Sequence, residues 1–453
     1  MWDIKLQVKN FFTKGHQRTL AAKKNILVSL VVRLLSIAIA FIMVPMTINY
    51  VNPSQYGIWL TLSSVIGWFN FFDIGLGNGL KNKLAQANAL GQYELGKIFV
   101  STTYAILTII ALVVFIVFLP LNHYLNWAVI LNTTHSPGLS LNHLALLIIG
   151  FFCLQFIFQL LNIVLVANHQ PSKVSLINLI GQIISIIIIF ILVRQNANGS
   201  LTYLILVLAG VPILVQFLAS VWFYRFSYRV FAPSLKAIQF KYAKDLLKTG
   251  GVFFIIQIGA LVLFQTDNIV ITQLFGPASV TVFNVAYKLF SMIIMVFTII
   301  MTPFWSAFTD AYSKNDMEWI KSTLTKMEKY WLLLAAATLA LLLASPLIFK
   351  LWMGANFQVP FSLSIAMSLY VIGYSWIMLI CYFLNGINKI RLQLYLYLIC
   401  TIVNIPLAIV LGKIIGIAGI TVANIMIFVF MGIVLYLQKN RIINNRATGV
   451  WNE

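Results

Sequence analysis

Long apolar segments recur along the whole chain and are separated by short polar breaks. A helix needs about 20 apolar residues to cross the roughly 30 Å hydrocarbon core of a bilayer. Twelve stretches meet this requirement, at approximately 25–49, 56–80, 98–119, 141–166, 174–193, 201–223, 249–274, 279–308, 331–351, 361–385, 391–411 and 416–437. The pattern predicts an all-α, polytopic membrane protein with twelve transmembrane helices.

The composition agrees with this pattern. Hydrophobic residues make up 61% of the 453 residues and charged residues only 9%, which excludes a soluble fold. Lys and Arg total 30, against 10 Asp and Glu. In a soluble protein such an excess would indicate nucleic acid as a partner, but here its distribution follows the membrane topology.

The basic residues alternate from loop to loop. If the N-terminus is cytoplasmic, 25 of the 30 Lys and Arg residues lie on the cytoplasmic side, as the positive-inside rule requires. Both termini are therefore predicted to be cytoplasmic. The predicted organisation is a basic N-terminus (1–24), a six-helix bundle (25–223), a basic cytoplasmic linker (224–248), a second six-helix bundle (249–437) and a cytoplasmic tail (438–453).

An internal repeat relates the two predicted bundles. YVNPSQYGIW at Tyr50–Trp59 aligns with LFGPASVTVF at Leu274–Phe283, and Pro53 falls on Pro277, at an offset of 224 residues. An even number of helices in each half gives both repeats the same orientation, so their pseudo-twofold axis runs along the membrane normal. Two pseudo-symmetric six-helix bundles around a central cavity are typical of a transporter.

Four charged residues lie within predicted helices: Arg33, Asp73, Asp267 and Lys288. Each costs about 2.5–3.5 kcal/mol at the bilayer centre on insertion scales, so we expect them to face the protein interior. Arg33 and Asp73 lie at matching depth, as do Asp267 and Lys288. Two interpretations stay open, namely a functional site or ion pairs that only fix helix packing. Arg33 and Asp73 can also extend towards the interface.

Uncharged polar residues follow helical spacing within several predicted spans. They are candidates for lining a wet cavity, although interhelical hydrogen bonding explains them equally well. The candidates are Gln155, Gln159, Asn162, Asn178, Gln182, Gln257 and Asn268.

Motifs for catalysis, nucleotide binding and metal binding are missing from the sequence. It contains no GxxxxGK[ST], HExxH or GxSxG, and its three cysteines stand apart within apolar segments. We therefore predict that the protein is not an enzyme and needs neither a cofactor nor a metal.

Three segments resemble a known family. They are Leu30–Val51 leading into NPSQYGIW, FFDIGLGNGLKNKLAQANALGQYE at Phe71–Glu94, and FQTDNIVITQLFGPASVTVFNVAYKL at Phe264–Leu289. They look like the polysaccharide-biosynthesis flippases, the O-antigen or capsule repeat-unit translocases, and the resemblance covers essentially the whole chain. The wider superfamily includes multidrug and toxin extrusion proteins and lipid II flippases.

This resemblance implies that undecaprenyl-diphosphate-linked oligosaccharide is moved from the cytoplasmic to the periplasmic leaflet of a bacterial inner membrane. Similarity to lipid II flippases implies that cations in the cavity meet the diphosphate, and Arg33, Lys81, Lys83 and Lys288 occupy comparable positions. Alternating access of the two halves supplies the movement. A proton or sodium gradient can supply the energy, with Asp267 as the coupling carboxylate. Membrane lipids, a polysaccharide polymerase and a chain-length regulator are the further partners implied.

Two other functions remain as alternatives. A cation-coupled multidrug exporter of the same superfamily is expected to have an acidic cavity, whereas the intramembrane charges here are balanced and the cytoplasmic side is basic. A membrane-embedded glycan polymerase or ligase is expected to need charged residues in a large outer loop. The longest predicted outer loop, Pro120–Ser140, has no Lys, Arg, Asp or Glu.

The predicted topology can be tested with reporter fusions. Reporters fused after Lys248 and at the C-terminus should show cytoplasmic activity, because most basic residues then lie on the side that resists translocation. Activity on the outer side for the fusion after Lys248 would reject the arrangement of two six-helix halves.

Overall fold

The computed structural model describes residues 17–67, 76–133, 140–168, 170–195, 199–245 and 266–452. All regular elements within these ranges are helical. Ten helices of the described part are long and apolar enough to cross a membrane. The prediction of an all-α membrane fold is therefore confirmed. The other two predicted spans, 56–80 and 249–274, each include residues outside the described ranges.

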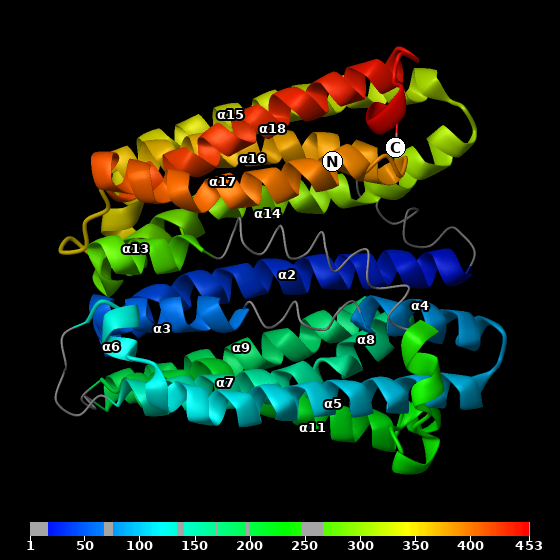
Figure 1. Ribbon diagram of the computed structural model, residues 1–453, viewed down its shortest axis with the longest axis horizontal. Helices are drawn as coiled ribbons and strands as arrows, with labels where there is room; N and C mark the ends of the chain where they lie inside the picture. The colour runs from blue at the N-terminus through cyan, green and yellow to red at the C-terminus, as the bar shows by residue number, and fades with distance from the viewer. Residues whose placement is uncertain are drawn as a thin grey trace, which may run out of the picture. The chain divides into compact units, whose positions relative to one another are not determined.

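The chain divides into two compact units, and the first comprises Met1–Asn52, Ile66–Trp127 and His135–Ile255. Within it, α9 packs between α2 and α11, while α5 packs against α7 (Figure 1). A π-helix at Leu206–Gly210 joins α10 to α11. The helices are α2 (Gln17–Tyr50), α4 (Leu76–Ala89), α5 (Tyr93–Tyr124), α7 (Leu141–Phe158), α8 (Leu160–Ala167), α9 (Pro171–Arg194), α10 (Leu201–Ile205) and α11 (Val211–Arg225).

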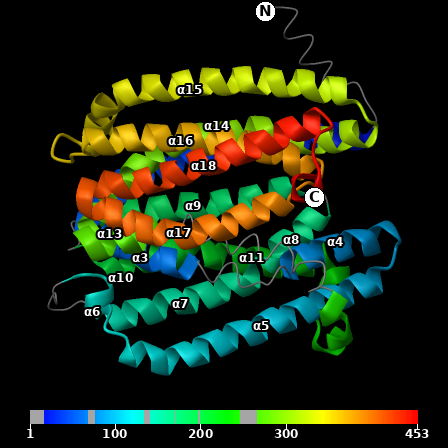
Figure 2. The ribbon, with the colours of Figure 1, turned by 45° about the horizontal axis from the view of Figure 1, so that its top comes forward.

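The second unit comprises Pro53–Val65, Ala128–Thr134 and Ile256–Glu453. At its centre α16 contacts α14, α15 and α18, and α15 runs alongside α14 and α16 (Figure 2). Its helices are most of α3 (Pro53–Gly67), the end of α6 (Trp127–Ile130), α13 (Asp267–Phe275), α14 (Pro277–Ser313), α15 (Met317–Met353), α16 (Phe361–Gly386), α17 (Arg391–Ile415) and α18 (Ile417–Ile443).

Two helices are much longer than the spans predicted for them. Both α14 and α15 contain 37 residues, or about 55 Å of helix, against a hydrocarbon thickness of roughly 30 Å. The polar segment 309–330 between the predicted spans is thus helical except at a tight turn, where Asn315 has a φ of 56°. The side chain of Asp316 then accepts a 3.0 Å hydrogen bond from the Trp319 amide and caps α15.

Helix starts agree with the sequence repeat. At the offset of 224 residues, α3 and α14 begin at the aligned residues Pro53 and Pro277, and α5 and α15 begin at Tyr93 and Met317. Proline suits the first turn of a helix because its missing N–H has no partner there anyway. The duplication visible in the sequence therefore extends to equivalent helix boundaries.

The aligned segments of α3 and α14 meet in a reciprocal contact within the second unit. The Thr281 hydroxyl donates a 2.6 Å hydrogen bond to the Pro53 carbonyl oxygen. In return, Gly57 lies so close to Pro277 that an added Cβ would come within 1.7 Å of the Pro277 carbonyl oxygen. Since the repeat pairs Pro53 with Pro277 and Gly57 with Thr281, the contact is self-complementary. It explains why residues 53–65 group with the second unit although the sequence places them in the bundle 25–223.

An ion pair between a buried lysine and a half-buried glutamate joins α15 to α18. Lys439 is only 4% exposed, and its Nζ lies 2.5 Å from Glu328 Oε1 and 4.2 Å from the centre of the Tyr436 ring. The residues after α18 also fold back, because Lys389 donates a hydrogen bond of 2.6 Å to the Asn452 carbonyl oxygen. The predicted tail 438–453 thus begins as the last turns of a helix and ends against its own unit.

Replacing Gly57 by Ala should separate α3 from α14. The new methyl group has no space beside the Pro277 backbone, and overpacking of this kind costs about 1–3 kcal/mol. Thermal unfolding of the purified protein in detergent would measure the loss. Gly150→Ala is the matched control, because its Cβ would meet only Phe115 at an ordinary 3.7 Å. Equal melting temperatures for Gly57→Ala and the wild type would contradict the contact.

Candidate functional site

A buried carboxylate lies at the start of α13. Asp267 is the first residue of that helix and is 8% exposed. Its Oδ2 accepts a 2.8 Å hydrogen bond from Asn424 Nδ2 on α18. Asn424 Oδ1 in turn accepts a 2.6 Å hydrogen bond from Asn404 Nδ2 on α17. A helix amino terminus favours negative charge, so the position suits an ionised carboxylate.

Together with Thr421, one turn before Asn424, these residues form a group that we call the Asp267 cluster (Asp267, Asn404, Thr421 and Asn424). Asp267 Oδ1, Asn404 Oδ1 and Thr421 Oγ1 are buried, and none has a hydrogen-bond partner among the described residues. A buried unpaired charge is very costly, and a carboxylate in this position is stabilised when it takes up a proton or holds a cation. Carboxylate, amide and hydroxyl oxygens suit hard cations.

Further polar groups continue from the Asp267 cluster onto α14. Asn268 Oδ1 accepts a 2.8 Å hydrogen bond from Asn284 Nδ2, and Lys288 lies one turn beyond Asn284. Lys288 is half-buried. The possible ion pair between Asp267 and Lys288 is not among the ion pairs of the described residues, and the carboxylate is bonded to Asn424. Asn268, a predicted cavity residue, thus belongs to a hydrogen-bonded pair.

Aromatic rings border this polar group. The ring of Tyr287 on α14 lies 6.0 Å from that of Tyr370 on α16, in an edge-on arrangement. Tyr370 in turn lies 5.1 Å from Phe428, one turn after Asn424 on α18. Such packing reduces access of water and lowers the local dielectric, which increases the effect of any charge on Asp267.

The cations predicted to bind substrate in the first unit lie on α2 and α4. Arg33 and Lys81 are exposed, and Lys83 is half-buried. The ion pairs of the described residues are Lys314 with Asp310 and Lys439 with Glu328, and so none of these three cations takes part. Asp73, the predicted partner of Arg33, lies outside the described residues, as does the predicted cavity residue Gln257.

The predicted cavity residues on α7 and α8 include one exposed side chain and one that is hydrogen-bonded to another helix. Gln155 is exposed, whereas Gln159 marks the break between the two helices. Asn162 Oδ1 accepts a 2.9 Å hydrogen bond from Gln216 Nε2 on α11. Of the two interpretations left open by the sequence, Asn162 thus fits interhelical bonding.

The polar residues on α9 also include both exposed and hydrogen-bonded side chains. Asn178 is exposed, while Gln182 is half-buried and its Oε1 has no partner among the described residues. Ser185, one turn further along, donates a 3.1 Å hydrogen bond to the Val207 carbonyl oxygen in the π-helix. The π-helix therefore has one of its carbonyl groups satisfied by a neighbouring helix.

Sequence reasoning missed three members of the Asp267 cluster: Asn404, Thr421 and Asn424. They are polar residues within the predicted apolar spans 391–411 and 416–437. Polar residues inside spans were a usable signal, because buried ones need partners. Their convergence on Asp267 depends on the tertiary packing of α13 against α17 and α18.

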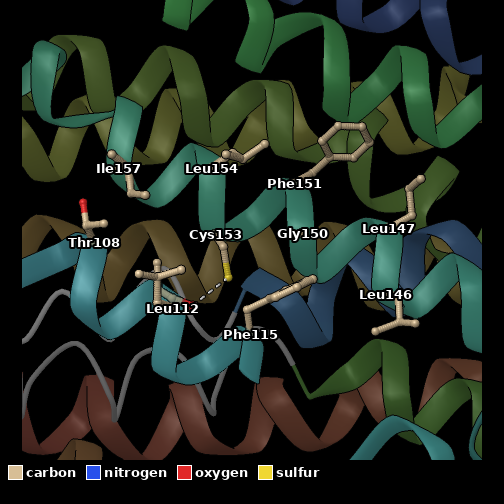
Figure 3. A pocket seen from close by; sticks show the side chains of 11 residues that line it. Thr108, Leu112, Phe115, Leu146, Leu147, Gly150, Phe151, Cys153, Leu154 and Ile157 are labelled. Carbon is tan, nitrogen blue, oxygen red and sulfur yellow. Dashed lines mark hydrogen bonds between the residues drawn. The ribbon is translucent and has the colours of Figure 1, made fainter. Parts of the chain in front are cut away.

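An apolar groove of about 410 Å³ lies elsewhere, between α5 and α7 of the first unit. Figure 3 shows the side chain of Cys153 on α7 pointing towards Leu112 and Phe115 of α5. Thr108 contributes a hydroxyl group, and the remaining lining residues are apolar or glycine. This groove suits hydrocarbon chains and has no charged group for a diphosphate.

Two sequence families match the chain. The profile described as polysaccharide biosynthesis protein matches residues 22–308, and the one described as MatE matches residues 253–410. The first match covers more than half of the chain. The chain belongs to the polysaccharide biosynthesis protein family.

Relatives in this family carry names related to O-antigen. A putative O-antigen export protein of Yersinia pseudotuberculosis is 24% identical over 385 residues, covering 79% of this chain and 82% of the relative. A putative O-antigen transporter of Salmonella typhi is 23% identical over 293 residues, covering 62% and 63%. The chain is a transporter of the polysaccharide flippase type.

Solved structures show the same fold. A multidrug resistance MATE family transporter of the MOP superfamily, in its inward-facing conformation, matches with a TM-score of 0.75 and 16% identity over 93% of this chain and 98% of that chain. A MOP superfamily transporter from Pyrococcus furiosus matches with a TM-score of 0.62 and 15% identity over 94% of this chain and 97% of that chain. The polysaccharide biosynthesis protein described here thus has a MATE-like fold.

Asn424→Leu should destabilise the protein by about 1–3 kcal/mol, because Asp267 and Asn404 then each lose a buried hydrogen-bond partner. Thermal unfolding in detergent would measure the change. Asn178→Leu is the control, since that exposed side chain should be replaced at little cost.

The triple variant Asp267→Leu, Asn404→Leu and Asn424→Leu should regain much of the lost stability, because it removes the carboxylate and the amide that Asn424→Leu alone leaves without their partner. A triple variant less stable than Asn424→Leu alone would show that the cluster is a net stabilising network.

Proposed function

We propose that this protein moves undecaprenyl-diphosphate-linked oligosaccharide repeat units from the cytoplasmic to the periplasmic leaflet of a bacterial inner membrane. Membership of the polysaccharide biosynthesis family and the O-antigen names of its relatives support this substrate class. A diphosphate and its sugars cannot cross hydrocarbon unaided, so a wet, positively charged route is needed. The polyprenyl chain can stay in lipid.

Cations that have no ion-pair partner among the described residues support binding of an anionic head group. Arg33, Lys81, Lys83 and Lys288 form no ion pair with another described residue. Lys or Arg inside a membrane protein is costly and marks substrate pathways, and an unpaired cation gains most from meeting an anion. These four side chains are our candidates for contact with the diphosphate.

The observation that carries the coupling mechanism is the Asp267 cluster. Its carboxylate is buried, forms no ion pair with another described residue and is bonded to Asn424, while the cluster also holds buried amide and hydroxyl oxygens that have no partner among the described residues. A group in this state exchanges a proton or a sodium ion with its surroundings, and its charge then changes the stability of the helix packing around it. Binding and release at Asp267 would thereby couple an ion gradient to transport.

Alternating access is the proposed movement. The two repeats share helix starts, and the aligned residues around Pro53 and Pro277 form a reciprocal contact. Contacts of this kind between related segments can open and close as a unit, because both partners contribute the same surface. We propose that this contact forms in one conformation and breaks in the other.

A multidrug exporter remains the second candidate. The MatE profile match at residues 253–410 and the MATE-like fold favour it. Organic cations would require an acidic binding surface, whereas the candidate binding residues here are basic.

Deleting the protein in its host should abolish long-chain surface polysaccharide and leave lipid-linked repeat units in the inner leaflet. Plasmid-borne wild-type protein should restore polysaccharide, which gel electrophoresis of surface glycans would measure. Asp267→Asn should restore far less at equal protein level, because its side chain cannot carry the exchanging charge. Leu333→Ala, at an exposed site on α15, is the control for expression. Normal polysaccharide with raised sensitivity to cationic dyes in the deletion strain would favour the exporter.

The coupling ion can be identified with the purified protein in liposomes. Translocation of a lipid-linked oligosaccharide should respond to an imposed proton or sodium gradient, and Asp267→Asn should remove that response. If wild-type transport occurs but responds to neither gradient, the coupling role of Asp267 is wrong although the flippase function stands.

A further inference from the structure

A connecting segment (residues 226–245) follows α11 in the first unit. It contains three 3-10 turns at Arg229–Phe231, Leu235–Ala237 and Phe240–Tyr242. These turns lie beside the first turns of α5, where Figure 1 shows them in green next to the start of the blue-cyan helix. The basic linker predicted from sequence therefore has a defined structure in its described part.

Backbone groups fasten the connecting segment to α5. The Ser234 amide donates a 3.1 Å hydrogen bond to Ser101 Oγ, and the Gln239 amide donates one of 3.0 Å to Thr102 Oγ1. Phe231 is buried, with its ring 6.0 Å from that of Tyr93. The segment thus has an inner face that is held by the unit.

Its outer face combines apolar and basic side chains. Val230, Leu235 and Phe240 are 53%, 88% and 55% exposed. Each is directly adjacent in sequence to an exposed cation, and these cations are Arg229, Lys236 and Lys241. No Asp or Glu occurs between residues 224 and 244.

The outer face of the connecting segment lies next to the end of a membrane-length helix. The segment begins where the membrane-length helix Leu201–Arg225 ends, next to the exposed aromatic residues Trp222 and Phe226. Aromatic residues in such positions are typical of the membrane–water interface. Apolar side chains with neighbouring cations are the features by which peripheral segments enter the interface of an anionic leaflet.

We propose that the connecting segment binds the anionic phospholipid head groups of the cytoplasmic leaflet, with Leu235 and Phe240 inserted between the lipids. Arg229, Lys236 and Lys241 contact the phosphates. Charge complementarity supports lipid over an acidic protein, because the cations are interleaved with apolar side chains at membrane level instead of forming one polar patch.

Lipid titration of the full-length protein tests this proposal. Native mass spectrometry in neutral detergent would follow binding of added phosphatidylglycerol or phosphatidylcholine. The variant Arg229→Gln, Lys236→Gln and Lys241→Gln should bind phosphatidylglycerol more weakly, by roughly fivefold for each charge removed, with phosphatidylcholine binding unchanged. Lys321→Gln, Lys326→Gln and Lys329→Gln, at exposed positions on α15, form the control with the same charge loss.

An equal loss of phosphatidylglycerol in both triple variants would overturn the proposal, since binding would then reflect net charge alone. Unchanged lipid binding in the connecting-segment variant would overturn it as well. If that variant kept its lipid but lost a co-purifying acidic protein, the surface would be a protein-docking site and not a lipid anchor. Thermal unfolding should be the same for both variants because the side chains are exposed.

Insertion can be measured separately from charge. A Leu235→Cys variant labelled with an environment-sensitive dye should show a blue-shifted emission in nanodiscs of phosphatidylcholine with phosphatidylglycerol. Thr448→Cys, exposed outside the connecting segment, should not. The native cysteines Cys153, Cys381 and Cys400 are buried and should react little. Equal spectra for the two labelled positions would show that Leu235 stays in water.

Discussion

Hydrocarbon offers no hydrogen bonds, and every polar group placed within it must find its partner in the protein. Helices satisfy the backbone, and side-chain pairs such as Asn162 with Gln216 satisfy polar residues between helices. Asp267 departs from this rule, because only one of its carboxylate oxygens is bonded within the described residues. Among the buried side-chain atoms without a partner in the described part of the chain, Asp267 Oδ1 is the one that belongs to a carboxylate, and its position suits exchange of a cation with the surroundings.

Much of the fold could be predicted from the sequence, because span length and loop charge are local properties. The alignment of Pro53 with Pro277 even located two helix starts. Hydropathy could not reveal that α14 and α15 continue beyond the predicted spans. It identifies the apolar residues that can lie in hydrocarbon, and the additional turns of these helices are polar. The link from Asp267 to Asn424 spans 157 residues of sequence and depends on tertiary packing, so no local pattern contained it.

The two units contain different candidate functional residues. The first unit carries the connecting segment and the cations Arg33, Lys81 and Lys83, which form no ion pair with another described residue. The second carries the Asp267 cluster and Lys288. Within the repeat, Asp267 aligns with Met43 and Asn404 with Ile180. Duplication therefore preserved the helix framework while the polar chemistry of the two copies diverged.

This difference between the two repeats limits the energy that the Asp267 cluster can supply for transport. With Met43 at the equivalent position, the first repeat has no carboxylate that corresponds to Asp267, so the Asp267 cluster contributes one monovalent ion per cycle to the proposed mechanism. One charge crossing 100 mV supplies about 2.3 kcal/mol, which sustains roughly a 50-fold ratio of product to substrate across the membrane. Beyond that ratio the membrane potential acting on this one ion could not drive further export. Continued export would then depend on how quickly the product is removed at the far leaflet.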